Sequence, residues 1–239
     1  MRAEDWDQFF VYQAKWAREA RNFVYRHTEI FNAKDVLELG CGTGVITQEI
    51  AERCDGRVVA IDINREFLEI AKRRVKAKNV EFMEKDAHAL PFPSSSFDRV
   101  YFANFLMWVR EPDKVFSEIV RVLRPSGYLG ILSEPDYGGR VDYPCGEIRE
   151  RVVLKLRSEG ANPFIGRRLR ELCKTHGLES KLDALQGMFS GYEIGKCYEF
   201  EVKFACVEDE VVAEVKRALD KGIAFLLVPI IYGYGWKSR

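Results

Sequence analysis

The spacing of hydrophobic residues divides the chain into a helical start, a regular middle and a less regular remainder. Apolar residues recur at helical spacing from Trp6 to Val24, with charged residues on the opposite side. Short apolar runs typical of buried strands follow at 35–39, 57–62, 80–84, 97–104 and 127–133. Helical patterns at 45–54, 65–77 and 113–124 lie between them. Strands that alternate with helices of about 10–15 residues form right-handed βαβ units, so the middle predicts a parallel sheet.

The remainder predicts more helices and two or three further strands. Helical patterns occur near 146–158, 166–176 and 208–221, and strands are predicted near 178–186, 199–205 and 225–236. No long linker, internal repeat or low-complexity tract interrupts the sequence. We therefore expect a single domain over 1–239. It would consist of a helical lid (1–32), a ligand-binding core (35–135) and an elaboration with closing strands (136–239).

Composition and charge narrow the class of protein. Lys+Arg and Asp+Glu both number 37, so the formal charge is zero and no basic excess favours nucleic acid. The first ten residues lack a signal-peptide pattern, and Pro229 interrupts the apolar run at 223–232, which is too short to span a bilayer. We expect a cytoplasmic protein without membrane insertion. The six cysteines, at 41, 54, 145, 173, 197 and 206, have no zinc-ligand spacing, and we expect neither a metal site nor a disulfide framework.

A glycine-rich turn follows the first predicted strand. Gly40, Gly42 and Gly44 would let the backbone approach a ligand and direct free N–H groups toward it. Their spacing differs from the G-x-G-x-x-G of dinucleotide binders. Glu38 lies just before the turn, where its carboxylate would repel a pyrophosphate. It suits a ligand that carries an ammonium or sulfonium charge.

Two further acids end the next two predicted strands. Asp62 ends the second strand, where a carboxylate can accept hydrogen bonds from both hydroxyls of a ribose. Asp86 follows the third strand, within reach of an adenine amino group. Taken singly, each acid could equally be a helix cap or a solvated turn residue. Together with Glu38, they predict a nucleoside site at the carboxyl edge of the sheet.

Four segments resemble the motifs of a known family. VLELGCGTG (36–44), AIDIN (60–64), EKDAHALPFPSSSFD (84–98) and RVLRPSGYLGI (121–131) are similar to motifs of class I S-adenosylmethionine methyltransferases of the type 11 branch. That branch includes the ubiquinone and menaquinone C-methyltransferases. The resemblance covers about residues 35–135. It implies an α/β, Rossmann-like fold with a seven-stranded, mostly parallel sheet, helices on both faces and an N-terminal helical lid.

The resemblance also implies a cofactor and the residues that would hold it. S-adenosyl-L-methionine would donate a methyl group to a small-molecule acceptor by in-line displacement. Its methionine part would meet the glycine turn and the end of the fourth strand, its ribose would meet the second strand, and its adenine would lie beside the third. The implied cofactor residues are Glu38, Gly40, Cys41, Gly42, Gly44, Asp62, Ile63, Asp86, Ala87 and Asn104.

The acceptor side is less specific. The segment after the fifth strand should lie beside the transferred methyl group, so Asp136 and Tyr137 are candidate catalytic residues and Glu134 a candidate acceptor-binding residue. Asp136 is equally well explained as a turn residue after a proline. Tyr12 and Trp16 could form a wall of the acceptor pocket or simply pack within the N-terminal helix.

Other functions remain open on the sequence alone. The N-P-P-Y type motif of enzymes that methylate amino groups of bases or glutamine is absent after the fourth strand, where the chain reads NFLMW. A protein or nucleic-acid methyltransferase, a cysteine-assisted arsenite methyltransferase and a non-catalytic cofactor-binding module are the alternatives. Cofactor turnover with a panel of acceptors would separate the enzyme from the binding module.

Overall fold

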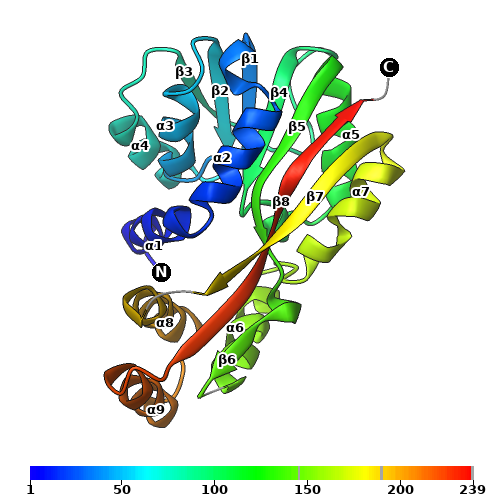
Figure 1. Cartoon of the computed structure of the whole chain (residues 1–239). Helices are drawn as coiled ribbons and strands as arrows, with labels where there is room; N and C mark the ends of the chain where they lie inside the picture. Colours follow the sequence, from blue (N-terminus) through cyan, green and yellow to red (C-terminus); the bar gives the residue numbers. More distant parts are fainter. Residues whose placement is uncertain (145, 189–190, 238–239) are drawn as a thin grey trace.

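A single sheet runs through the whole molecule (Figure 1). The computed structural model describes residues 1–144, 146–188 and 191–237, so Cys145 lies outside the described residues. The strand order is β3-β2-β1-β4-β5-β8-β6, and β7 pairs with β8 off this path. The first five strands are β1 (Asp35–Leu39), β2 (Arg57–Asp62), β3 (Val80–Glu84), β4 (Phe97–Ala103) and β5 (Leu123–Pro135). The last three are β6 (Val141–Tyr143), β7 (Leu178–Met188) and β8 (Phe225–Lys237).

The five neighbouring strands β3-β2-β1-β4-β5 are all parallel, as the sequence predicts. Both faces of the central strands are buried, which explains their nearly continuous apolar runs. In β1, Val36 packs into the cluster on one face, whereas Leu37 and Leu39 pack into the main cluster on the other. The sheet described here has eight strands rather than the seven expected. The expectation counted the family's seven and did not foresee β6, a three-residue strand that the sequence pattern does not reveal.

Helices cover both faces of the parallel half. Figure 1 shows α2, α3 and α4 on one side, with α5 and α7 on the other. These helices are α2 (Arg18–His27), α3 (Val45–Ala51), α4 (Arg65–Arg74), α5 (Pro112–Val122) and α7 (Leu169–Thr175). Helix α5 begins with Pro112. The first turn of a helix tolerates proline, because an N–H group at this position would have no acceptor within the helix. Its buried residues Val115, Phe116, Ile119 and Val122 follow helical spacing and form part of the main core.

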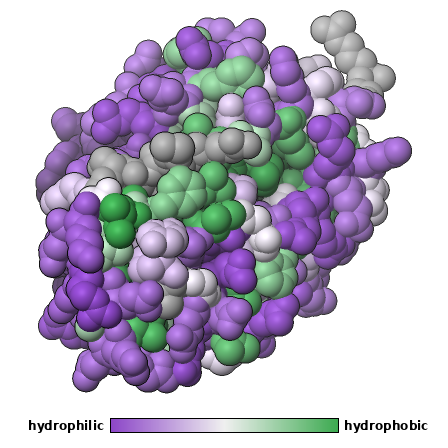
Figure 2. Space-filling view, turned by 60° about the horizontal axis from the view of Figure 1, so that its bottom comes forward, coloured by the Kyte–Doolittle hydropathy of each residue, from purple (hydrophilic) through white to green (hydrophobic). Residues whose placement is uncertain are grey.

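The long strands β5 and β8 continue beyond the carboxyl edge of the parallel sheet into a second layer of elements. The start of β8 pairs with β6 through Phe225, and its end pairs with β5 through Trp236. The helices α6 (Gly146–Ser158), α8 (Gly191–Ala205) and α9 (Asp209–Asp220) surround this extension (Figure 1). Seen from this end, the surface shows apolar side chains gathered beside polar ones (Figure 2). No described helix is long and apolar enough to cross a membrane.

The N-terminal segment contains two helices rather than the single expected one. The chain leaves helical geometry at Ala17, which separates α1 (Ala3–Trp16) from α2. Helix α2 buries Ala20, Val24 and Tyr25 against the sheet. Helix α1 instead crosses the carboxyl edge and packs against α3, α4 and α8. The break allows one segment to support the sheet and the other to cover its edge.

The strand predicted at 199–205 is wrong, because these residues belong to helix α8. Apolar residues alternate with charged ones from Tyr198 to Phe204, which imitates the period of a strand. The buried positions are Ile194, Cys197, Tyr198, Glu201 and Phe204, which follow helical spacing. The alternation suggested a strand because Glu201, a charged residue, lies on the buried face of the helix and was taken for a solvent-facing position. That carboxylate pairs with Arg140 from another element.

We predict that the substitution Val24→Ala destabilises the fold by about 2 kcal/mol. Val24 is fully buried between α2 and the sheet, so the change removes buried methyl groups and leaves a cavity. Urea denaturation measures the effect. The matched change Val141→Ala, at a side chain on β6 that is 53% exposed, should alter stability by less than about 0.5 kcal/mol. Equal losses in the two variants would contradict the packing of α2 described here.

Candidate functional site

A cavity of about 650 Å³ opens at the carboxyl edge of the parallel strands. Residues after β1, β2, β3 and β4 form its floor, and Trp6, Phe10 and Gln13 of α1 form its roof. Of the ten residues predicted to hold the cofactor, all but Gly44 line this cavity: Glu38, Gly40, Cys41, Gly42, Asp62, Ile63, Asp86, Ala87 and Asn104. The fold therefore brings nine of the ten predicted residues together at one cavity, beside others that the sequence did not indicate.

The glycine turn is required by geometry at two positions. Gly40 has a φ of 65°, and a Cβ there would lie 2.3 Å from Cδ2 of Phe105. Gly42 has a φ of 54°, and a Cβ there would lie 3.3 Å from Cε2 of Phe10 of α1. Gly44 lies outside the cavity lining because its Cβ direction points to α4, where a Cβ would lie 3.0 Å from that of Ala71. This third glycine serves the packing of α4 and the start of α3.

Glu38 places a buried carboxylate in the cavity wall. It is the last residue but one of β1 and only 2% exposed, and its Oε2 atom has no hydrogen-bond partner among the described residues. Burial, together with the negative charge of Asp62, raises the pKa of Glu38 to about 8. A buried carboxyl oxygen without a partner is costly, so it is available to a hydrogen-bond donor, and a cation that enters the cavity would favour the ionised form of Glu38.

Asp62 is held by the backbone around it. The amide of Gly42 donates to its Oδ2 and the amide of Asn64 to its Oδ1, each at 2.8 Å. Burial nevertheless raises the pKa of Asp62. Each oxygen keeps one lone pair for a ligand, since a carboxylate oxygen can accept two hydrogen bonds. Next to it, Ile63 is 71% exposed although it is apolar, and its side chain lines the cavity opposite Phe67.

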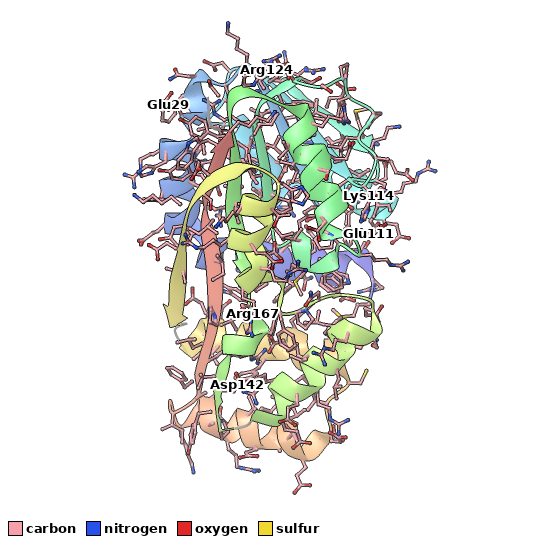
Figure 3. All side chains as sticks on the ribbon, turned by 90° about the vertical axis from the view of Figure 1, so that its right-hand side faces the viewer. Glu29, Glu111, Lys114, Arg124, Asp142 and Arg167 are labelled. Atoms are coloured by element: carbon pink, nitrogen blue, oxygen red, sulfur yellow. The ribbon has the colours of Figure 1, made fainter. Side chains whose placement is uncertain are left out.

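Asp86 has a partner that the sequence reading missed. The backbone amide and the Nδ1 atom of His88 both contact Oδ1 of Asp86, at 2.9 Å and 2.6 Å, and the pKa of Asp86 is lowered as a result. His88 Nε2 accepts from the amide of Glu111 at 3.4 Å, which fixes the ring at the start of α5. Figure 3 labels Glu111 beside Lys114. The only signal for His88 was its place two residues after Asp86, inside the motif at 84–98.

Asn104 joins the cavity to the end of β4. Its φ of 49° lies in the left-handed region, which asparagine tolerates better than most residues. Its amide donates to the carbonyl of Ser133 at 2.6 Å. The residues that follow, Phe105 and Trp108, continue the cavity wall, and Trp108 packs edge-on against Trp6 of α1. Sequence reasoning did not single out Phe10, Gln13, Phe67, His88, Phe105, Trp108 or Arg110, although all line the cavity.

Two of the predicted acceptor-side residues are engaged elsewhere. Glu134 is fully buried and accepts the backbone amides of Phe105, Leu106 and Met107 at 2.9–3.1 Å. Asp136 forms a two-point ion pair with Arg167 and accepts the amide of Gly138. Neither side chain is part of the cavity lining. Both carboxylates therefore hold neighbouring segments in place rather than facing a ligand. Most of their partners lie far away in the sequence, so no sequence pattern indicated these contacts.

Tyr12 also lies outside the cavity, with its hydroxyl 3.2 Å from that of Tyr192. Trp16 and Tyr137 instead line a second, smaller cavity of about 20 Å³. Gln13 and Asn104 line both spaces, so the small cavity adjoins the large one on the side away from Asp86. Among the described residues, no cluster of histidines, cysteines and acids has the arrangement of a metal site. The described cysteines are free, and four of the five are buried.

Known proteins resemble this chain over the same core. The sequence model of a family described as "Methyltransferase domain" matches residues 37–131. The chain is 36% identical over 155 residues to a demethylmenaquinone methyltransferase of Thermus thermophilus, covering 64% of this chain and 65% of that protein. It is 38% identical over 118 residues to the ubiquinone/menaquinone biosynthesis C-methyltransferase UbiE of Hahella chejuensis, covering 47% of each. Residues 37–131 thus match a methyltransferase domain, and the chain is similar over this core to S-adenosylmethionine methyltransferases of the type 11 branch.

The methyltransferase fold extends beyond the matched core. A putative methyltransferase of Bacillus halodurans superposes with a TM-score of 0.66 at 16% identity, covering 92% of this chain and 99% of that one. At this identity the likeness concerns the fold alone, and it confirms a Rossmann-like α/β arrangement. The chain spans about half the length of the curated relatives it matches.

We predict that Glu38 makes stability depend on pH. Its pKa is raised from 4.5 to about 8, so its contribution is fully present below about pH 4.5 and is lost as pH rises to about 8. The Glu38→Gln variant has no group to ionise at this position, so it does not lose stability in this way. As the pH rises from about 4.5 to about 8, the free energy of unfolding of the variant should increase relative to that of wild type, by up to about 1.4 kcal/mol per pH unit.

Thermal denaturation of ligand-free protein between pH 5 and 8.5 measures this difference. The matched change Glu66→Gln, at an exposed position on α4, should follow wild type at every pH. If the stability of Glu38→Gln also followed that of wild type at every pH, ionisation of Glu38 would not be the cause of the pH dependence.

Proposed function

We propose that the chain binds S-adenosylmethionine in the large cavity and transfers its methyl group to a small-molecule acceptor. The observation that carries this proposal is the pair of carboxylates at the ends of β1 and β2. Glu38 offers a buried, unpartnered oxygen, and Asp62 lies beside it with free lone pairs on both oxygens. One carboxylate suits the cationic methionine end of the cofactor and the other suits ribose hydroxyls. Pyrophosphate ligands fit this wall poorly.

The remaining cavity residues fit the same ligand. Ile63 presents an apolar side chain at the point where an adenine ring would lie, and Ala87 lies beside it in the wall. Asp86 keeps Oδ2 free of hydrogen bonds within the described part of the chain, which leaves an acceptor for an exocyclic amino group. In this proposal the turn at Gly40 to Gly42 and Asn104 surround the methionine part.

The bound cofactor would supply a methyl group on a sulfonium, whose carbon–sulfur bond breaks as the bond to the acceptor forms. The electron pair of the broken bond would stay on sulfur, which becomes neutral, and a neutral acceptor would take up the positive charge and lose it with a proton. The chain's own contribution is alignment and exclusion of water. Trp6 and Phe10 of α1 cover the cavity, and Phe105 sets the wall next to the glycine turn. Glu134 holds the turn at 105–107 in place through its three backbone bonds.

We also propose that the acceptor is a small molecule rather than nucleic acid. The relatives quoted above carry names of quinone-biosynthesis methyltransferases, and the balanced charge of this chain favours no polyanion. In the same proposal, 1–239 acts as one domain in the cytoplasm without membrane insertion. Helix α1 serves as the lid, the sheet edge as the cofactor site and the elements after residue 136 as the acceptor side.

We predict that the Asp62→Asn variant binds S-adenosylhomocysteine about tenfold to a hundredfold more weakly than wild type. The amide has one acceptor oxygen in place of two charged ones, and a charge-assisted hydrogen bond contributes about 1.5–3 kcal/mol. Calorimetry measures the affinity. The control Asp55→Asn changes an exposed carboxylate in the turn before β2 and should bind as wild type does. Wild-type protein that prefers NAD to S-adenosylhomocysteine would refute the proposed function.

We predict that removal of residues 1–16 speeds dissociation of S-adenosylhomocysteine by about tenfold or more. The deletion removes the cavity roof, including Trp6 and Phe10, but keeps α2 and its buried side chains. Stopped-flow displacement measures the rate, and circular dichroism should show that the sheet remains folded. An unchanged dissociation rate in the folded truncation would rule out α1 as the lid.

A further inference from the structure

The small second cavity adjoins the large one, and its mostly apolar wall carries several polar side chains. It has a volume of about 20 Å³, which is enough for one polar group or one water molecule. Gln13 and Asn104 form the boundary that it shares with the large cavity. Its far wall comes from β5, from the turn after it and from α8, through Ser133, Tyr137 and Glu201. A ligand group that passes Asn104 would therefore enter a site with several hydrogen-bonding side chains.

Tyr137 provides a hydroxyl without a partner. No hydrogen bond to this hydroxyl occurs among the described residues, although the backbone amide of Tyr137 is fixed by the carbonyl of Pro163. Burial and the negative charge of Glu201 raise the pKa of Tyr137 far above its ordinary value. The phenol therefore stays neutral and can both donate and accept a hydrogen bond. It can orient a ligand but cannot act as a phenolate base.

A buried cluster of charges lies behind this wall. Arg140 donates to both oxygens of Glu201, at 2.6 Å and 2.8 Å, and to Oδ1 of Asp142 at 2.7 Å. All three side chains are at most 3% exposed. Asp142, labelled in Figure 3, keeps a buried Oδ2 without a partner among the described residues. One guanidinium faces two carboxylates, so with both acids ionised the cluster carries a net negative charge.

The charges nearest to the cluster do not cancel this excess. Arg167 donates two hydrogen bonds to Asp136, the residue before Tyr137. Its charge is therefore balanced by Asp136 rather than by the cluster. Arg149 donates to the backbone carbonyl of Arg140, while its guanidinium is 42% exposed and lies 3.9 Å from Glu150. A second anion in this small space would be repelled by Glu201 and would lose its hydration. A neutral or cationic donor would be favoured.

We propose that the small cavity is the acceptor's anchoring subsite, in which Tyr137 and Glu201 select a hydroxyl or amino group against a carboxylate or phosphate. This inference rests on the proposed function, because it treats the large cavity as the cofactor site. Arg140 donates one hydrogen bond to each Glu201 oxygen, and the Cys197 thiol also hydrogen-bonds to this carboxylate, which leaves one lone pair for a ligand. This lone pair, together with the Tyr137 hydroxyl, offers an acceptor for an O–H or N–H group. Tyr137 and Glu201 are thus specificity residues rather than general bases.

Three small aromatic probes of similar shape test this subsite: 4-methylphenol, 4-methylaniline and 4-methylbenzoate. Their affinities are measured by ligand-observed NMR titration, with free protein and with protein saturated by S-adenosylhomocysteine. We expect the phenol and the aniline to bind at least about tenfold more tightly than the benzoate in both states. Equal affinities for the phenol and the benzoate, or no binding of any probe, would overturn the proposal.

The Tyr137→Phe variant separates hydrogen bonding from packing. It should bind 4-methylphenol about threefold to tenfold more weakly than wild type and S-adenosylhomocysteine equally well. The matched control is Tyr128→Phe. Tyr128 lies on β5 opposite Trp236 of β8 and lines neither cavity, so this change should alter neither affinity. Wild-type affinity for the phenol in Tyr137→Phe would remove Tyr137 from the subsite.

A second variant tests the charge. Glu201→Gln should reduce the preference for the phenol over the benzoate by about tenfold, because the cluster then becomes neutral. If this variant does not fold, the wild-type probe series and Tyr137→Phe still decide the matter. Failure of S-adenosylhomocysteine to bind would refute the proposed function, whereas the probe series on free protein judges the subsite separately. A crystal structure with 4-methylphenol bound away from Tyr137 would also overturn the inference.

Discussion

The burial of carboxylates at the carboxyl edge of the sheet is the constraint on which the site depends. Glu38 ends a strand that is buried on both faces, so its side chain cannot reach solvent without passing through the cavity. The adjacent turn uses positive φ angles at Gly40 and Gly42, which brings the Gly42 amide onto Asp62. The turn thus fixes one carboxylate and leaves the other with an unpaired oxygen. A fold selected for stability alone would avoid this arrangement.

The sequence predicted the elements whose structure is determined locally. The parallel strands and the glycine turn follow from hydrophobic period and backbone geometry, so their boundaries differ by only a few residues from those observed. The acid positions at the ends of β1 and β2 followed from the same reasoning. Their meeting at one edge is a property of parallel strands rather than of any particular contact. This is why the polar groups of the cavity wall were predictable, whereas the N-terminal helix was predicted as a lid without its lining side chains Phe10 and Gln13.

Residues whose roles depend on distant partners could not be predicted. Asp136 could be a catalytic residue or a turn residue on the sequence alone, and no sequence pattern indicated Arg167, 31 residues further along the chain, with which it pairs. Glu134 likewise accepts amides from a turn that precedes it by almost thirty residues. Glu201 misled in the opposite direction, because a charged residue on a buried helix face imitates the solvent side of a strand. In each case the deciding interaction is an ion pair or hydrogen bond between segments with no shared pattern.

Asn104 connects the two cavities, and its geometry links their functions. The backbone of this residue is in the left-handed conformation, and its backbone N–H donates a hydrogen bond to the carbonyl of Ser133. One face of it belongs to the large cavity and another to the small one. A group anchored near Tyr137 therefore lies at a distance from the cofactor wall that β4 and β5 determine together. Because these strands pair directly, the proposed sites for the two ligands would be aligned by the sheet rather than by the lid.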